Sequence, residues 1–323
     1  MENKLGVVVV DYKSMERTCD YIKKFCEKVR DFENALFVVV DNSDSEENYH
    51  YLWNEFTYLE ECETYRTEYA EAVAANKFLY KGCAIYALRA AGNIGYARGN
   101  NLGIEYIKRV EKIDTQYLLI SNNDIMFLED LLIEDLLKPF KTDKNIAVVG
   151  PKILEKAGGS PQSPRNKMSI WKLLVLYNIN LIFGNQLKKY VDDIDREPEN
   201  GKYYWVMGCF LLIETKKFFE AGMFDNGTFL YSEEMILSER LEKIGYYMYY
   251  CDDIVVLHNH GKTINKHVSS NNNVKYLYQS HRLCCQKYRN ATKTQLLIAD
   301  IVFEVYKVQY IVKQKVKGLL RGR

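Results

Sequence analysis

The sequence lacks three features that would each assign it to a broad class of protein. The longest apolar stretch, residues 171–184, is interrupted by a lysine and two asparagines and falls short of the roughly 18 to 20 residues of a transmembrane helix. It therefore predicts a core or interfacial helix. The 44 basic and 43 acidic residues nearly cancel, so net charge gives no reason to expect nucleic acid as a partner. No C-x-x-C pair occurs among the eight cysteines, which removes the usual zinc-site spacing.

The cellular location of the protein is predicted from its cysteines and from its first residues. Cys284 and Cys285 are adjacent, but no second pair follows them, and a chain of 323 residues needs no disulfide staples. The first residues, MENKLGVVVVDYK, are typical of a strand and not of a secretory leader. We therefore expect reduced thiols and a cytoplasmic protein.

The first half of the chain alternates apolar strands with amphipathic helices. Ser14 is a plausible N-cap of the first helix. This alternation predicts an α/β protein with a largely parallel sheet covered on both faces, in which ligands bind beyond the carboxyl ends of the strands. Residues 157–200 lose the pattern and predict a mobile excursion, and the chain after Lys266 is polar and then helical. Strands are predicted at residues 5–12, in 35–48 before an acidic end, at the start of 83–110, in 115–124 and at 145–153.

Polar side chains gather where three of these strands end. Asp41 begins the cluster after the second strand, residues 93–101 follow the third, and residues 122–124 follow the fourth. Three coincident clusters favour a binding site over three unrelated turns. Asp41 suits hydrogen bonds from a nucleobase or ribose, and an Asx-turn or helix cap is the alternative.

Residues 93–101 carry groups that suit a sugar nucleotide. The amides of Asn100 and Asn101 can donate to and accept from sugar hydroxyls and phosphate oxygens. Arg98 can neutralise phosphate charge, with a solvated surface charge as the alternative. The glycines of this loop follow the third strand, whereas a dinucleotide fingerprint would follow the first and a P-loop would end in Lys-Ser or Lys-Thr. Both of those nucleotide folds are excluded.

Five motifs in a fixed order point to one family. They are VVVDNSDSEEN, NIGYARGNNLG, LLISNND, WVMGCFLLIETKKFFEAGMFDNGTFLYSEE and VVLHNHG. Together they resemble the motif set of family 2 glycosyltransferases with the GT-A fold, most closely the rhamnosyltransferase-like branch that builds bacterial capsular and cell-wall polysaccharides. The resemblance spans residues 5–263. It implies a GT-A domain over residues 1–265, with a nucleotide-sugar half at 1–125 and an acceptor half at 126–265, and a C-terminal helical extension at 266–323.

The resemblance also implies an activity and a cofactor. An inverting hexosyltransferase would move rhamnose or another hexose from a dTDP- or UDP-sugar to a hydroxyl of a growing polysaccharide or lipid-linked glycan. Asn122 and Asp124 stand at the family's D-x-D position, so only one carboxylate remains there. Asp124 would hold Mg²⁺ or Mn²⁺ against the departing diphosphate, whose charge a hard cation stabilises. A nucleotidyltransferase, or a non-catalytic module that binds sugar nucleotides, is the alternative. The implied donor-binding residues are Asp41, Asn93, Gly95, Arg98, Asn100, Asn101, Asn122 and Asn123.

Two histidines and three further positions complete the implied site. His258 aligns best with the family's late histidine, a candidate metal or diphosphate ligand, and His260 is the nearby alternative. Trp205, Gly208 and Asp225 align with the acceptor-side framework. For Trp205, core packing is an equally plausible role.

The stretch YSEEMILSERLEKIG predicts a helix with Ser232 as its N-cap and Gly245 at its end. Two acids in a first turn have an ordinary explanation in the helix dipole. Adjacent helical residues point about 100° apart, so Glu233 and Glu234 cannot both face one substrate atom. Inverting transfer needs a carboxylate base, and the resemblance assigns that role to Glu234, with Glu233 as the runner-up.

The end of the chain predicts a contact with a membrane surface. Residues 306–323 contain six basic residues and no acid. Apolar residues recur there at helical spacing, and a basic amphipathic helix is typical of binding to a membrane surface. Such binding suits a lipid-linked acceptor at the inner face of the cell membrane. A helix packed on the domain or against the second subunit of a homodimer is the alternative, and no motif for nucleic acid is present.

Overall fold

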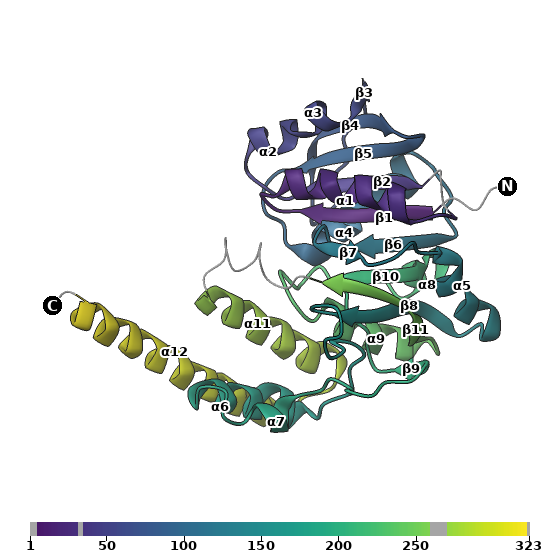
Figure 1. Cartoon of the computed structure of the whole chain (residues 1–323). Coiled ribbons are helices and arrows are strands. Elements are labelled where there is room, and N and C mark those ends of the chain that lie inside the picture. Colours follow the sequence, from purple (N-terminus) through teal and green to yellow (C-terminus); the bar gives the residue numbers. More distant parts are fainter. Residues whose placement is uncertain (1–4, 32–34, 259–269, 322–323) are drawn as a thin grey trace.

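The computed structural model describes residues 5–31, 35–258 and 270–321, and one sheet of eleven strands runs through it (Figure 1). The strand order is β3-β4-β5-β2-β1-β6-β10-β8-β11-β7, with β9 paired to β11. The strands are β1 (Leu5–Asp11), β2 (Leu36–Asp41), β3 (Thr57–Glu61), β4 (Ala72–Tyr80), β5 (Cys83–Ala90), β6 (Tyr117–Ser121), β7 (Ile125–Phe127), β8 (Ile146–Leu154), β9 (Gly201–Tyr203), β10 (Phe210–Glu214) and β11 (Tyr247–His258).

The middle of the sheet is parallel, as the alternation of strands and helices predicts. β5, β2, β1 and β6 lie side by side and run in the same direction. All five predicted strands are present. Beyond β6 the sheet becomes mixed, because β10 inserts antiparallel between β6 and β8, and β8 then pairs parallel with β11.

Helices cover both faces of the sheet. Their bounds are α1 (Met15–Lys28), α2 (Glu46–His50), α3 (Leu52–Glu55), α4 (Tyr96–Glu105), η1 (Tyr106–Val110), α5 (Ile133–Thr142), η2 (Lys172–Leu176), α6 (Tyr177–Ile182), α7 (Lys188–Val191), α8 (Thr215–Glu220), α9 (Glu233–Lys243), α11 (Ser270–Tyr288) and α12 (Lys293–Arg321).

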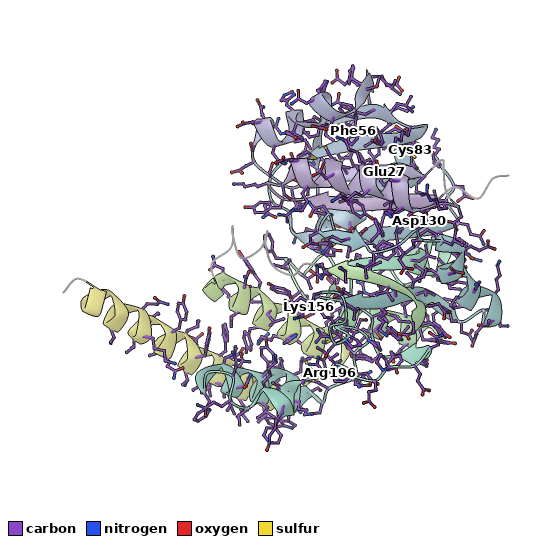
Figure 2. All side chains as sticks on the ribbon, in the orientation of Figure 1. Glu27, Phe56, Cys83, Asp130, Lys156 and Arg196 are labelled. Atoms are coloured by element: carbon purple, nitrogen blue, oxygen red, sulfur yellow. The ribbon has the colours of Figure 1, made fainter. Side chains whose placement is uncertain are left out.

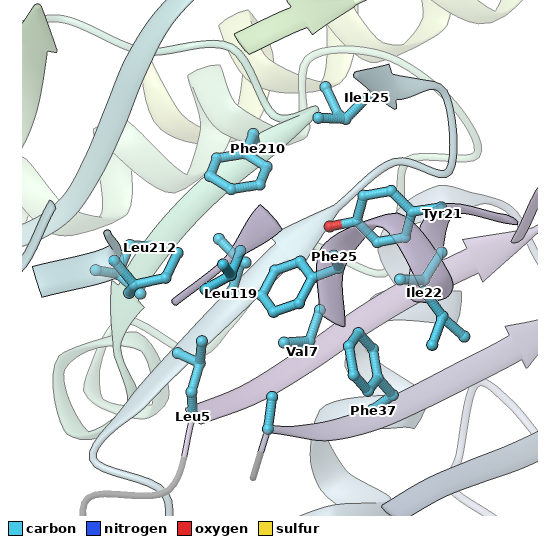
Figure 3. Packing of buried hydrophobic residues seen from close by; sticks show 14 of the residues in the cluster. Leu5, Val7, Tyr21, Ile22, Phe25, Phe37, Leu119, Ile125, Phe210 and Leu212 are labelled. Carbon is cyan, nitrogen blue, oxygen red and sulfur yellow. The ribbon is translucent and has the colours of Figure 1, made fainter. Parts of the chain in front are cut away.

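Each face has its own apolar core. On one face α1 and α5 pack on the sheet, and Phe25 of α1 meets Phe37 of β2 edge to face with ring centroids 5.3 Å apart (Figure 3). On the other face α4, η1, α8 and α9 pack against alternate residues of the same strands. Both faces of the central strands are therefore buried, which is why their sequences are continuously apolar rather than alternating.

A third core joins the C-terminal helices to the rest of the chain. Leu173 and Leu174 of η2, Ile236 of α9, Cys284 of α11 and Phe303 of α12 belong to it. The helix expected within residues 171–184 is thus confirmed as η2 and α6, and part of the stretch that was expected to be a mobile excursion packs in this core. Lys156 and Arg196, near the two ends of that stretch, are labelled in Figure 2.

Helix α12 has one packed face and one exposed face. Leu296, Ala299 and Phe303 are buried in the third core. In the part of the chain that the structure describes, no helix is both long and apolar enough to cross a membrane. The exposed apolar residues of α12 are Leu297, Ile301, Val305, Val308, Ile311, Val312 and Val316.

Candidate active site

A cavity of about 430 Å³ lies beyond the carboxyl ends of β1 and β6. Its walls come from the ends of these strands, the start of α4, the loop before β10, the start of α9 and the end of β11. Nine of the residues predicted to form a site meet there, although they are spread over more than 160 positions of the sequence. These nine are Asn93, Gly95, Asn122, Asn123, Asp124, Gly208, Glu233, Glu234 and His258.

Asp124 and His258 face each other because of how β7 pairs with β11. After β6 ends, the chain turns at Asp124 and enters β7, which runs antiparallel to β11 with Ile125 opposite His258. The two side chains are largely buried, and Nε2 of His258 lies 3.2 Å from Oδ1 of Asp124. The pairing register therefore places a carboxylate oxygen and an imidazole nitrogen side by side on the cavity wall.

This pair of donors suits a divalent cation only in part. Carboxylate and imidazole groups are both accepted by Mn²⁺, and Mg²⁺ prefers the oxygen. Among residues 5–31, 35–258 and 270–321, no group of three His, Cys, Asp or Glu side chains could hold a metal on its own. The residues present would fit a cation only if a bound ligand and water supplied its remaining ligands.

Asn122 and Asn123 point in different directions and have different surroundings. The hydroxyl of Tyr96 lies 3.0 Å from Oδ1 of Asn122 and 2.9 Å from the carbonyl oxygen of Gly208. Asn123 turns toward α1, where its amide nitrogen lies within 3.1 Å of oxygens of Asp11, Ser14 and Thr18. Asn122 thus joins two walls of the cavity, and Asn123 fixes the end of β6 to α1.

Asp41 is buried in a polar network behind the cavity. Its Oδ1 accepts hydrogen bonds from the backbone N–H of Ser43 at 2.9 Å and from the Asn48 amide at 3.0 Å. The same Asn48 amide donates to Asp11 at 2.8 Å. Burial, with a smaller contribution from the negative charge of Asp11, raises the pKa of Asp41 to about 6. The bond to Ser43 is the Asx-turn that was the alternative for Asp41.

Arg98 and Asn101 hold the loop that precedes α9. Nε of Arg98 donates to the carbonyl of Asn226 at 2.8 Å, and the Asn101 amide donates to the carbonyl of Phe224 at 2.9 Å. Asn100 is buried, and its amide donates within its own helix at 3.0 Å. The side chains of these three residues are therefore engaged with the protein itself.

Residue 95 must be glycine because two loops approach each other closely at this position. Its φ is +85°, and a Cβ there would lie 2.4 Å from the carbonyl oxygen of Phe229. The N–H of Tyr96 donates to that same carbonyl at 2.9 Å. A side chain at residue 95 would separate the start of α4 from the loop that leads to α9.

Glu234 lies against the backbone of Gly208. A Cβ on Gly208 would fall 1.9 Å from Oε1 of Glu234, so only glycine leaves room for the carboxylate. Burial raises the pKa of Glu234, and the backbone N–H groups of Glu234 and Gly208 partly offset the shift by donating to it. Glu233 is more deeply buried, and burial together with the charge of Glu234 raises the pKa of Glu233 well above its usual range.

The turn into α9 is strained. Tyr231 and Ser232 have φ values of 75° and 66°, a region that side chains other than Asn, Asp and Gly rarely adopt. Ser232 is the N-cap by position, as predicted, but it makes no side-chain capping bond in the described structure. Backbone strain of this kind concentrates at functional sites.

No family model matches the chain, but two curated relatives do. A low-salt glycan biosynthesis hexosyltransferase of Haloferax volcanii is 23% identical over 262 residues, covering 80% of this chain and 68% of the relative. A rhamnosyltransferase of Escherichia coli is 24% identical over 246 residues, covering 74% of this chain and 78% of the relative.

Solved structures agree on the fold. A mannosyltransferase from Pyrobaculum calidifontis, in complex with GDP-Man and Mn²⁺, superposes with a TM-score of 0.52 at 11% identity, over 96% of this chain and 75% of that one. GalNAc-T7, with UDP, GalNAc and Mn²⁺, gives 0.51 at 16% identity, over 80% of this chain and 44% of that one. This chain is a glycosyltransferase with the GT-A fold, similar in sequence to a hexosyltransferase and a rhamnosyltransferase.

Of the three residues predicted to belong to the acceptor side of this glycosyltransferase, Gly208 lines the cavity, and Trp205 and Asp225 do not. The ring of Trp205 packs under the guanidinium of Arg165, whose carbon lies 5.0 Å from the ring centroid. Asp225 is buried and accepts hydrogen bonds from Lys287, at 2.8 Å, and from Tyr288. Burial alone would raise the pKa of Asp225, but these donors more than offset it and hold the pKa below its usual value. His260 lies outside the described residues.

Several cavity residues of the glycosyltransferase were not predicted. Aromatic side chains form much of the wall, and Cys209 and Met207 add to it. Their positions in the sequence could have indicated them, because each aromatic residue stands within a few positions of a predicted site residue or strand end. The unpredicted aromatic residues are Tyr12, Tyr96, Phe229 and Tyr231.

Proposed function

We propose that this glycosyltransferase moves a hexose from a nucleoside diphosphate to a hydroxyl of a growing glycan, with inversion at the anomeric carbon. One observation carries the proposal. Glu234 and the Asp124–His258 pair line the same cavity, so the proposed base and the proposed diphosphate site would share one space. An inverting transfer needs both at once, because the acceptor attacks as the diphosphate departs.

The donor would occupy the side of the cavity next to β1 and β6. Asp124 and His258 would hold Mn²⁺ or Mg²⁺ on the diphosphate, and the Mn²⁺ in both solved structures named above supports this. The cation would neutralise the charge that collects on the leaving diphosphate. Asn93, Gly95 and Asn122 would contact the donor directly.

Other residues predicted to bind the donor would act through the loops that they hold. Asn123 would fix the end of β6, and Arg98 and Asn101 would fix the loop before α9. Asp41 and Asn100, which are buried behind the cavity, would hold the segments that they hydrogen-bond. On this account residues 1–125 would supply the donor side together with His258, the rest of residues 126–265 the acceptor side, and residues 266–323 an extension. UDP- or dTDP-sugars are the proposed donors.

Glu234 would act as the base. The oxygen of the acceptor hydroxyl would bond to the anomeric carbon while the bond from that carbon to the diphosphate oxygen breaks, and the proton of the hydroxyl would pass to Glu234. Burial favours this transfer, because it raises the proton affinity of the carboxylate. The fully buried Glu233 would stay protonated and support its neighbour.

The acceptor would be a polysaccharide or lipid-linked glycan at the inner face of the cell membrane, as for a capsular or cell-wall polymer. The names of the two relatives, a glycan biosynthesis hexosyltransferase and a rhamnosyltransferase, support a glycan product. The exposed apolar residues of α12 and the basic residues around them support peripheral contact with an anionic bilayer.

Nucleotide release from a panel of UDP-, dTDP- and GDP-sugars, with Mn²⁺ and with or without acceptor glycans, tests the proposal. We expect release from at least one donor that Glu234→Gln and Asp124→Ala both lose. Release of pyrophosphate from a nucleoside triphosphate would instead indicate a nucleotidyltransferase. Tight binding of donor without any turnover would indicate a non-catalytic module.

A further inference from the structure

A second hollow, of about 460 Å³, adjoins the catalytic cavity. It lies between α11 and the loop at residues 227–229, and Phe229 lines both hollows. Ser280 of α11 donates a hydrogen bond to the carbonyl of Leu230 at 2.9 Å, and Leu230 is part of the cavity wall. This hydrogen bond therefore links the wall of the second hollow to the wall of the first.

One face of α11 supplies most of the lining. Tyr276, Gln279, Leu283 and Gln286 follow one another at spacings of three and four residues, so they form one stripe along the helix. Gly227 allows this face to approach, because a Cβ on it would lie 2.9 Å from Cδ2 of Leu283. Most residues that line the second hollow therefore belong to the C-terminal extension and do not line the catalytic cavity.

The lining has the chemistry of a neutral carbohydrate site. Tyr276 and Phe229 place two aromatic rings with centroids 4.6 Å apart at the junction of the two hollows, and such rings suit the apolar face of a pyranose. Gln279 and Gln286 are exposed, and amides both donate to and accept from hydroxyl groups.

Charge argues against an anionic ligand. The guanidinium of Arg282, which also lines the hollow, is paired with Asp300 at 2.8 and 3.1 Å. The same guanidinium donates to Oε1 of Gln286 at 2.8 Å. Its charge is therefore neutralised within the protein, which leaves hydroxyl groups as the better match for this surface.

We propose that the second hollow is a subsite for the acceptor glycan, which holds sugar units beyond the one whose hydroxyl reacts. This proposal rests on the proposed function. An acceptor chain would run from Glu234 past Phe229 and along the exposed stripe of α11. The enzyme would then prefer acceptors of two or more sugars over monosaccharides, although the chemistry needs only one hydroxyl.

Two measurements on the full chain test the subsite. The first is binding to an array of bacterial surface oligosaccharides one to four sugars long, with UDP and Mn²⁺ present. We expect the wild type to bind at least one glycan of two or more sugars, and Tyr276→Ala and Gln279→Ala to weaken that binding about tenfold or more. Gln314→Ala, at an exposed glutamine of α12, is the matched control and should bind normally.

The second measurement is nucleotide release from the donor with water as the only acceptor. It should stay within about twofold of the wild type in Gln279→Ala and Gln314→Ala, because neither side chain lines the catalytic cavity. Equal array binding by all variants, or binding only to monosaccharides, or to nothing, would overturn the subsite. Normal array binding without release from any donor would leave the subsite standing and overturn the proposed function instead.

Discussion

The backbone of Gly208 lies so close to the Glu234 carboxylate that a Cβ on residue 208 would sit 1.9 Å from Oε1. The N–H of Gly208 donates to that carboxylate. The glycine therefore does two things for the proposed base: it leaves space, and it holds one carboxylate oxygen in place.

Gly208→Ala should accordingly reduce turnover by about 100-fold or more, the scale expected when a general base is displaced. The fold should survive, because the side chain that must move lines a cavity. Gly201→Ala is the control, since the nearest atom to a Cβ there is 3.9 Å away. Steady-state rates and a thermal unfolding curve for both variants give the answer, and a fully active Gly208→Ala would contradict the role given to this contact.

Substituting glutamine for each of the two adjacent glutamates distinguishes their roles. Glu234→Gln keeps the size of the side chain but cannot accept a proton, so turnover should fall by roughly 10²- to 10⁴-fold while donor affinity stays nearly unchanged. Glu233→Gln should do less, because burial and the charge of Glu234 raise the pKa of this carboxyl and so disfavour its charged form. A dead Glu233→Gln beside an active Glu234→Gln would move the base by one residue.

The pH dependence of the wild type follows from the burial of Glu234. A base works only when it is unprotonated, and burial raises the pKa of this carboxyl. The rate should therefore rise with pH through a midpoint above about 4.3, the ordinary value for glutamate. A pH–rate profile with saturating donor tests this, and a flat profile down to pH 4 would contradict it.

Asp124 and His258 should share one function. Asp124→Ala should nearly abolish activity, and excess EDTA should do the same to the wild type. His258→Ala should weaken Mn²⁺-dependent binding of nucleotide more than His260→Ala does. Titration calorimetry with nucleotide, with and without Mn²⁺, measures both effects. Full turnover in EDTA would remove the metal from the mechanism, and the reverse order of the two histidines would assign the ligand to His260.

Asp225 should matter for stability rather than for catalysis. Its carboxylate binds Lys287 and Tyr288 of α11 and lies 3.6 Å from Arg240 of α9, so it ties the two helices together. Asp225→Ala should cost about 2 kcal/mol and lower the Tm by roughly 4 to 8 °C.

The control for Asp225 is Asp44→Ala, which removes an exposed ion pair with Lys13 and should change the Tm little. Donor affinity, measured at a temperature where both variants are folded, should match that of the wild type. A stable Asp225→Ala with impaired acceptor binding would return this residue to the acceptor side.

The sequence predicts the central strands and the cavity well because both depend on local patterns. A buried parallel strand must be apolar, and its polar end marks the edge where ligands bind, which is how residues 122–124 were found. The starts of α1 and α9 are predicted for a similar reason, since these helices follow the N-cap residues Ser14 and Ser232.

Contacts between distant segments could not be predicted in this way. Nothing near Arg98 or Asn101 in the sequence shows that their side chains are used by residues 224–226, more than 120 positions away. The hairpin of β3 and β4 was missed because β3 is fully exposed and lacks the apolar pattern of a buried strand. The α11 hollow depends on how that helix packs, which a helical pattern alone does not specify.

Helix α12 gives the last prediction. Its exposed residues Leu297, Ile301, Val305, Val308 and Val312 follow spacings of three and four, so they form one apolar stripe opposite the face that packs on the protein. Beyond Glu304 the helix has no acid, and several lysines follow. An apolar stripe beside basic residues suits the surface of an anionic bilayer.

The double variant Val308→Gln, Val312→Gln should therefore bind anionic vesicles less than the wild type, while its turnover with a soluble acceptor stays the same. The packed face of α12 is untouched by these changes, so the fold should hold. Binding of the wild type should weaken as salt rises, because attraction to a charged surface is screened within about 10 Å at 0.1 M salt. Vesicle co-sedimentation at two salt concentrations measures this, with Gln314→Ala as the control. If the wild type ignores vesicles and sediments as a dimer that the double variant dissociates, the stripe is a contact between two copies of the chain.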